Sequence, residues 1–148
     1  MQLRSPSFEN NSKIPSKYTC DGENISPPLN ISEVPPSTKS LVLIMDDPDA
    51  MKPAGKVWDH WIVFNIPPET EEVPEGTEPK GIQGTTSFES TGYGGPCPPD
   101  AEHGYIFKLY ALDSELELSE GARKSDVEAA MESHIIKEVK LTGRYERK

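Results

Sequence analysis

Three apolar stretches in an otherwise polar chain have the length and composition of β-strands. Residues 40–47 form a continuous apolar run between turn-forming residues, which is typical of a strand buried on both faces. Residues 57–66 are rich in β-branched and aromatic side chains and end at a Pro-Pro pair, and residues 105–112 form the third run. The pattern predicts three core strands but leaves their arrangement open.

The first 39 residues show little periodicity and many turn signals, such as Ser26-Pro27-Pro28. Long loops are expected there, as in the polar connections 69–78 and 81–90, of which the second has one apolar anchor, Phe88. Scattered apolar residues should hold the early loops against a core. These residues are Phe8, Ile14, Tyr18, Ile25, Leu29 and Ile31.

The one strong helical signal comes late and predicts a short helix at about residues 126–137. Ser125 and Glu128 fit a capping box, and core-facing positions recur with helical spacing. These positions are Val127, Ala130, Met131, His134 and Ile135. Alternating side chains over residues 138–145 predict a last strand.

Length and charge narrow the class of protein. A chain of 148 residues can bury one hydrophobic core, so a single domain over residues 1–148 is expected. The 25 acidic and 15 basic residues give a net charge of −10, which disfavours DNA, RNA and anionic membranes as partners. No segment approaches the ~20 apolar residues of a membrane span and no signal-peptide pattern is present, so a cytoplasmic protein without integral membrane association is expected.

The two cysteines, Cys20 and Cys97, match neither a zinc quartet nor a dense disulfide framework. A single bridge between them is one reading. The preferred reading is a pair of free, buried thiols.

Polar groups gather where the predicted strands begin or end, which is where binding sites form. The candidates are Asp47, Asp49, His60, His103 and Tyr105, with Gly94, Gly95 and Pro96 in the loop Gly92–Pro99. Strand alternation places His60 on the face of Trp58, Ile62 and Phe64, and His103 on the face of Tyr105 and Phe107. Taken singly, each candidate is more simply a turn residue or a core residue.

Four kinds of chemistry could use this set of residues. A metal site is disfavoured because His60 and His103 lie far apart in the sequence, and a glycosidase pair because Asp47 and Asp49 are too close. Cys97 lies between prolines without a nucleophile elbow, so it is read as a packing residue even though His103 could act as its base.

An anion pocket is preferred. Ring N–H groups of His60 and His103 and backbone N–H groups of Gly94 and Gly95 would donate to phosphate or carboxylate oxygens. Nearby aspartates would orient both histidines and raise their pKa values, and could also receive an ammonium group. A zwitterionic headgroup is therefore an attractive ligand, and no cofactor is expected.

Several segments together resemble the phosphatidylethanolamine-binding protein family, which includes the Raf kinase inhibitor proteins. The chain looks closest to the short bacterial and archaeal branch, and the likeness runs nearly end to end. Three motifs occur in the family's order, and the opening segment is similar as well. They are Asp47-Pro48-Asp49-Ala50, His60 to Pro67, and Gly94 to Pro99 with His103-x-Tyr105, with Tyr18 to Leu29 as the opening segment.

The resemblance implies a two-sheet antiparallel Greek-key β-sandwich with a late helix and an anion pocket at one end. It places Asp47, Asp49, His60, Gly95, His103 and Tyr105 on the pocket, and brings the two cysteines close together, reduced in a typical cytosol.

Three departures set this chain apart from the family. Met51 replaces a frequent proline and Gly104 replaces an arginine that many members carry. The chain ends at Lys148, without the C-terminal helix that gates the pocket in larger eukaryotic relatives, so a more open pocket is expected.

The function expected from these observations is non-enzymatic binding of phosphate, phosphoethanolamine or acetate-like ligands, with regulation of a partner protein. An alternative of another class is inhibition of a serine protease or kinase through the rigid Pro-rich loop. An enzyme acting on a small phosphorylated substrate is given less weight. The aromatic content is compatible with a homodimer.

Overall fold

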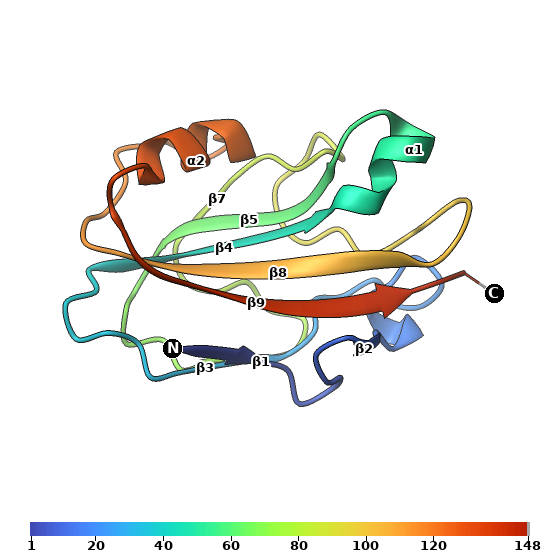
Figure 1. Cartoon of the computed structure of the whole chain (residues 1–148), viewed down its shortest axis with the longest axis horizontal. Helices are drawn as coiled ribbons and strands as arrows, with labels where there is room; N and C mark the ends of the chain where they lie inside the picture. Colours follow the sequence, from blue (N-terminus) through green and yellow to red (C-terminus); the bar gives the residue numbers. More distant parts are fainter. Residues whose placement is uncertain (148) are drawn as a thin grey trace.

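The computed structural model describes residues 1–147, which form two packed β-sheets (Figure 1). The larger sheet has six strands in the order β2-β9-β8-β4-β5-β7, and the smaller has three in the order β1-β3-β6. Neighbours are antiparallel, except for the parallel pair β2 and β9. The strands are β1 Gln2–Arg4, β2 Ser12–Lys13, β3 Leu29–Ser32, β4 Ser40–Asp47, β5 Trp58–Ile66, β6 Glu72–Val73, β7 Ile82–Gln83, β8 His103–Leu112 and β9 Ile135–Tyr145.

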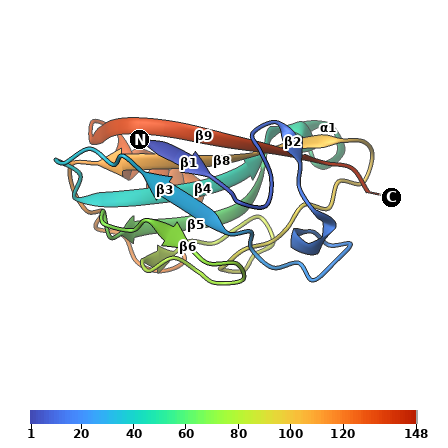
Figure 2. The same cartoon turned by 90° about the horizontal axis from the view of Figure 1, so that it is seen from below.

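The main hydrophobic core lies between the two sheets. Figure 2 shows the smaller sheet lying against one face of the larger one. Side chains of β1, β3 and β6 pack there against those of β4, β5, β8 and β9. Five of the six early apolar residues are buried in this core and Ile25 is partly buried against it, so the predicted anchoring of the first loops is confirmed. The β-sandwich expected from the family resemblance is confirmed as well.

Strand β4 lies in the middle of the larger sheet and is buried along its whole length. One face belongs to the core between the sheets, through residues such as Leu43, and the other to a second apolar cluster, through residues such as Ile44. This double burial explains why residues 40–47 read as a continuous apolar run instead of an alternating one.

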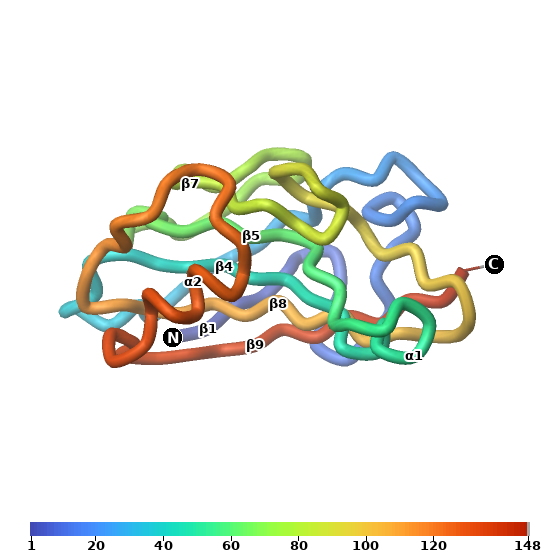
Figure 3. Tube along the Cα trace, turned by 90° about the horizontal axis from the view of Figure 1, so that it is seen from above, coloured from blue at the N-terminus to red at the C-terminus, as the bar shows by residue number. Residues whose placement is uncertain are grey.

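Two α-helices lie near opposite ends of the larger sheet (Figure 3). The short α1, Met51–Ala54, follows the 3-10 turn η2, Pro48–Ala50, at the end of β4, and another such turn, η1, spans Ser16–Tyr18. Helix α2, Lys124–Met131, covers the second apolar cluster. No helix among residues 1–147 is long and apolar enough to span a membrane.

Helix α2 is shorter than the predicted range 126–137. Its first turn is closed by Asp126, whose carboxylate accepts the backbone N–H of Arg123 at 3.0 Å, and not by Ser125. At the other end Ser133 has a φ of 72°, which turns the chain, and Ile135 begins β9. The helical spacing of His134 and Ile135 is therefore coincidental, since both side chains are exposed.

Candidate functional site

The ends of three neighbouring strands meet at one edge of the larger sheet. Because β4 runs antiparallel to both β5 and β8, its C-terminal end lies beside the N-terminal ends of the other two. Asp47 at the end of β4 pairs with Trp58 at the start of β5, while His103 and Tyr105 lie at the start of β8. Antiparallel pairing thus brings residues from three distant segments to one place.

A cavity of about 220 Å³ opens at this edge. Its walls are largely apolar and aromatic, and four polar side chains face it from β4, β5 and β8, namely those of Asp47, His60, His103 and Tyr105. The other lining residues are Ala50, Pro53, Ala54, Trp58, Phe88, Cys97, Pro98 and Pro99. A small apolar cavity with a few convergent polar groups is the usual form of a small-molecule site.

His103 is held between two carboxylates. Its Nδ1 lies 2.6 Å from Oδ2 of Asp47 and its Nε2 lies 2.7 Å from Oδ1 of Asp100. Burial alone would lower the pKa of His103, but the two hydrogen bonds and the charges of their acceptors raise it above its usual value. Of the two aspartates predicted to orient the histidines, Asp47 contacts His103 and Asp49 does not, and the second carboxylate is that of Asp100. Both ring nitrogens are thereby engaged within the protein.

His60 lies on a different face of β5 from the one that strict alternation predicts. Met45 on β4 pairs with Trp61, and the next residue, Asp46, pairs with Asp59, so His60 is an extra residue in a β-bulge. The bulge turns its ring toward Tyr105, with the ring centroids 5.2 Å apart. Ile62 and Phe64 instead face the second apolar cluster on the other side of the sheet. The predicted grouping of His60 with these two residues is wrong.

The surroundings of His60 keep its ring neutral. The side chain packs edge-on against the rings of Tyr105 and Phe88, and its Nδ1 lies 2.6 Å from the carbonyl oxygen of Gly94. Burial lowers the pKa of His60 to about 4, although Asp46 and Asp59 act in the opposite direction. The prediction that aspartates keep this imidazole cationic is therefore wrong, because loss of hydration outweighs their charges.

Tyr105 carries a buried hydroxyl group next to the cavity. Its side chain is 0% exposed, and the hydroxyl has no hydrogen-bond partner of acceptable geometry among residues 1–147, although the backbone of Cys97 is nearby. Burial raises the pKa of Tyr105, so the group remains a neutral donor at physiological pH. Unpaired buried hydroxyl groups are rare in folded proteins because each costs about 1–3 kcal/mol.

The N–H groups of the glycine-rich loop bond to neighbouring segments of the protein and are not free to bind an anion. The N–H of Gly94 donates to the His60 carbonyl at 2.9 Å, and the N–H of Gly95 donates to Oδ1 of Asn24 at 2.9 Å. A Cβ at Gly95 would meet Tyr18 backbone oxygen at 2.4 Å, which explains why this position lacks a side chain. Gly94, Gly95 and Pro96 do not line the cavity, and the two N–H groups expected to bind an anion are bonded within the protein.

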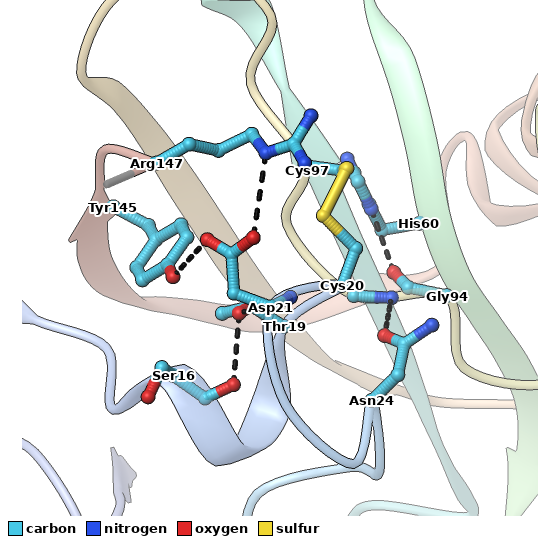
Figure 4. The surroundings of a disulfide bond; sticks show 11 residues. Ser16, Thr19, Cys20, Asp21, Asn24, His60, Gly94, Cys97, Tyr145 and Arg147 are labelled. Atoms are coloured by element: carbon cyan, nitrogen blue, oxygen red, sulfur yellow. Dashed lines mark hydrogen bonds and ion pairs between the residues drawn. A yellow bond between two sulfur atoms is a disulfide. The ribbon is translucent and has the colours of Figure 1, made fainter.

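Cys20 and Cys97 form a disulfide bond (Figure 4). The prediction of free, reduced and buried thiols is wrong: neither cysteine is free, and Cys97 is exposed at the cavity mouth. The proximity implied by the family resemblance is confirmed. The backbone N–H of Cys20 also donates to the carbonyl oxygen of Pro96 at 3.1 Å, so the disulfide adds to an existing contact.

Asp49 lies outside the cavity, although it was predicted as a site residue. Its carboxylate accepts the backbone N–H of Gly104 at 2.7 Å, and its own N–H donates to Oδ1 of Asp47 at 2.9 Å. It joins the end of β4 to the start of β8.

A Cβ at Gly104 would come no closer than 3.6 Å to any neighbour, so space does not explain the missing arginine. Met51 lies exposed in a helical turn, and no peptide bond within residues 1–147 is cis.

Two residues of the site were not among the predicted ones. Phe88 lines the cavity, although it was expected only to anchor a loop, and Asp100 contacts His103 from outside the lining. The i, i+3 spacing of Asp100 and His103 is the signal that could have paired them. In the described chain, no group of three or more histidine, cysteine, aspartate or glutamate residues has the arrangement of a metal site.

Comparison with known proteins gives a consistent answer. The family model for phosphatidylethanolamine-binding protein matches residues 4–146. The UPF0098 protein of Methanothermobacter thermautotrophicus is 52% identical, with 99% of each chain covered. The crystal structure of CT736 of Chlamydia trachomatis, described as a homologue of phosphatidylethanolamine-binding protein, superimposes with a TM-score of 0.95 at 44% identity over 99% of this chain and 97% of that one. YbcL of Escherichia coli gives 0.90 at 32% identity over 99% and 98%.

The fold and the cavity define a β-sandwich protein of a binding class. This chain belongs to the phosphatidylethanolamine-binding protein family. Its relatives place it in the bacterial and archaeal branch, as the sequence motifs indicated.

Proposed function

We propose that this protein binds a small phosphorylated or zwitterionic ligand, of the size of phosphoethanolamine, in the cavity at the end of β4, and that it does so without catalysis. The observation that carries the proposal is Tyr105, whose side chain lines the cavity and whose buried hydroxyl donates to no group within residues 1–147. A ligand oxygen accepting from this group would remove an energetic cost already present in the free protein.

Charge near the cavity supports a ligand with groups of both signs. His103, whose pKa is raised, favours an anionic group, whereas the carboxylate of Asp47 favours an ammonium group. Aromatic walls at Trp58 and Phe88 favour a compact cation or an alkyl chain between the two groups. The absence of a free thiol at Cys97 supports the non-enzymatic part of the proposal, since this residue was the candidate nucleophile.

Removing one hydroxyl tests the proposal. Phosphoethanolamine titrated into labelled protein should shift the NMR signals of His60 and His103, and Tyr105→Phe should weaken binding by about fivefold, the equivalent of one hydrogen bond of ~1 kcal/mol. Tyr110→Phe is the matched control, because Tyr110 belongs to the second apolar cluster. Unchanged histidine signals at millimolar ligand would refute the proposal.

Inhibition of a protease or kinase is a second candidate, favoured by one observation. The loop that leads to Pro99 is fixed by the disulfide and by the hydrogen bond from the Tyr93 hydroxyl to the Tyr18 carbonyl at 2.7 Å, and rigid loops lose little entropy on binding. Substituting the exposed Ala101 and Glu102, which do not line the cavity, with glycine should then weaken inhibition and leave phosphoethanolamine binding intact. Equal inhibition by this variant and the wild type would count against the second candidate.

We also propose a cytoplasmic location, which can be tested through the disulfide. Disulfide bonds persist mainly in oxidising compartments, although intracellular proteins of hyperthermophiles are an exception. Alkylation of intact cells before lysis, followed by a non-reducing gel, would show whether Cys20 and Cys97 are joined in the cytoplasm or only in an exported fraction.

A further inference from the structure

The hydrogen bond of His60 to the Gly94 carbonyl determines which ring nitrogen carries the proton. A carbonyl oxygen can only accept, so Nδ1 of the neutral ring must be the donor at 2.6 Å. Nε2 then carries a lone pair and acts as an acceptor. No other residue in the range 1–147 bonds to Nε2, and the side chain of His60 lines the cavity.

The rest of the cavity offers few donors. Both ring nitrogens of His103 are engaged by carboxylates, and the N–H groups of Gly94 and Gly95 are bonded within the protein. Among the lining side chains, the donors that make no hydrogen bond within residues 1–147 are the Tyr105 hydroxyl and the indole N–H of Trp58. A fully ionised phosphate beside His60 would meet the Nε2 lone pair of His60 and the carboxylate of Asp47, and both repel it.

We infer that the cavity selects phosphate monoesters carrying one proton over phosphodiesters, and that His60 is the residue that sets this specificity. The inference rests on the proposed function. In the monoanion of a monoester, the P–OH group donates to Nε2 of His60, while an unesterified oxygen accepts from the Tyr105 hydroxyl. A phosphodiester has no P–OH group, so the lone pair of Nε2 would face a phosphate oxygen.

Protonation of His60 does not rescue the diester near neutral pH. The ring is 3% exposed, and burial lowers its pKa to about 4. The charges that act on it are those of Asp46, Asp59 and His103, and Asp47 and Tyr105 line the same cavity. Asp46 and Asp59 lie on the α2 side of the sheet, where Lys124 contacts both. The His103 cation opposes a second positive charge, while Asp46 and Asp59 are already included in the low value.

The inference predicts a particular pH dependence. The second pKa of a phosphate monoester is about 6, so the monoanion becomes about tenfold scarcer with each pH unit above that value. Affinity for a monoester should fall in the same proportion between pH 6.5 and 8.5. Loss of charge from His103 at high pH would weaken the binding of monoesters and diesters alike. The pH dependence of diester binding therefore measures this shared effect.

Calorimetry with two matched ligands tests the inference. Phosphoethanolamine and its methyl diester differ by one methyl group and by the P–OH proton. At pH 6.0 the monoester should bind at least about tenfold more tightly, as expected for a well-placed hydrogen bond to a buried acceptor. At pH 7.5, buffers of different ionisation enthalpy should show uptake of about one proton with the monoester and none with the diester. Glycerophosphoethanolamine, the lipid headgroup, should behave as the diester does.

His60→Gln provides the second test. A glutamine amide can donate or accept without titrating, so the variant should bind both esters with similar affinity and lose the extra pH dependence of the monoester. Should this variant fail to fold, the wild-type measurements decide. Equal affinities and equal pH profiles of the two esters would overturn the inference and leave the proposed function standing. Absence of binding by both esters between pH 5.5 and 8.5 would overturn both.

Discussion

At the scale of single residues, the pair of carboxylates around His103 controls the charge beside the cavity. Asp47 is buried with the histidine, while Asp100 is partly exposed and approaches from the Pro-rich loop. The two contacts raise the pKa of His103 above the value of an unfolded chain. Such a histidine stabilises the fold fully below its unfolded pKa of about 6.5, and this contribution is lost as the pH rises through the folded value.

Asp100→Asn should therefore lower the pKa of His103 and reduce stability more at pH 6 than at pH 9. The reason is that the asparagine removes the negative charge that favours the imidazolium, which exists mainly at the lower pH. Urea denaturation at the two pH values and an NMR titration of the His103 ring measure the two effects.

Asp113→Asn is the matched control for this prediction. It removes the same charge from the only other pair of this kind in the described chain, between Asp113 and the exposed His134, with Nδ1 and Oδ1 2.8 Å apart. Exposed ion pairs contribute little, so stability should change by less than about 0.5 kcal/mol at either pH. A loss with Asp100→Asn that is equal at pH 6 and pH 9 would contradict the assignment.

The convergence of Asp47, His60, His103 and Tyr105 on one cavity could be predicted from sequence, but their protonation could not. Asp47, His103 and Tyr105 stand beside proline turns at strand ends, which is a local signal. The neutral state of His60 depends on a bulge and on two aromatic rings from other segments. Likewise, the sequence does not show that the N–H of Gly95 is already bonded. Only the folded chain brings the side chain of Asn24 close enough to accept it.

At the scale of elements, the disulfide joins the turn after η1 to the loop before β8. Cys20 and Cys97 are separated by 77 positions, so no spacing rule points to the bond. Closure of so long a loop in the unfolded chain lowers its entropy considerably. The chain-entropy model gives about 4.5 kcal/mol of stabilisation, and native-state effects increase or decrease this value.

Replacing both cysteines by serine should lower the free energy of unfolding by about 2–4 kcal/mol. The cavity should still form, because the Cys20 N–H to Pro96 carbonyl and Gly95 N–H to Asn24 hydrogen bonds remain. Urea denaturation with and without reductant measures the loss, and the double variant should not respond to reductant. A wild-type protein whose stability is also unaffected by reductant would contradict the prediction.

Helix α2 is attached to the sheet by buried charges as well as by apolar contacts. Lys124 contacts Asp46 at 3.2 Å and Asp59 at 2.9 Å, and Lys108 reaches the same oxygen of Asp46 at 2.9 Å. The other carboxylate oxygen of Asp46 is buried without a hydrogen-bond partner. The two lysines therefore compensate carboxylates that are costly to bury.

Lys124→Ala should destabilise the fold by about 2 kcal/mol, since it leaves buried carboxylates with fewer partners while Lys108 remains. Thermal and urea denaturation measure the loss. Arg123→Ala is the neighbouring control, because the Arg123 pair with Glu89 is exposed and should contribute at most about 0.5 kcal/mol. Similar losses in the two variants would refute a special role for the buried cluster.

At the scale of the whole molecule, topology explains why a sequence with weak local signals forms one site. Each predicted core strand was found, because its apolar run reflects its own burial. The order of the strands depends on pairings between distant segments, which no single run encodes. The family resemblance implied the two-sheet architecture, and the order itself was not predicted. The antiparallel order β8-β4-β5 then places three strand ends, and hence the site, at one edge.

The overall charge of the molecule opposes its local cation. The chain carries a net charge of −10, while the cations near the cavity are His103, itself flanked by Asp47 and Asp100, and Lys56, whose Nζ lies 5.2 Å from the centroid of the Trp58 ring. A surface of this kind repels anionic membranes over a distance of about 10 Å at 0.1 M salt. Ligand binding in the cavity is therefore expected to concern soluble small molecules instead of headgroups displayed on a charged bilayer.

Vesicles test this separation between cavity and surface. The protein should not sediment with phosphatidylcholine vesicles containing 20 mol% phosphatidylserine at 20 mM or 150 mM salt, because the bilayer and the protein carry charge of the same sign. Adding phosphatidylethanolamine should not increase sedimentation. Its phosphodiester has no P–OH group to donate to Nε2 of His60. Sedimentation at 20 mM that disappears at 150 mM salt would reveal a basic patch strong enough to overcome the net charge. Sedimentation that depends on phosphatidylethanolamine at both salt concentrations would show instead that the cavity accepts a diester.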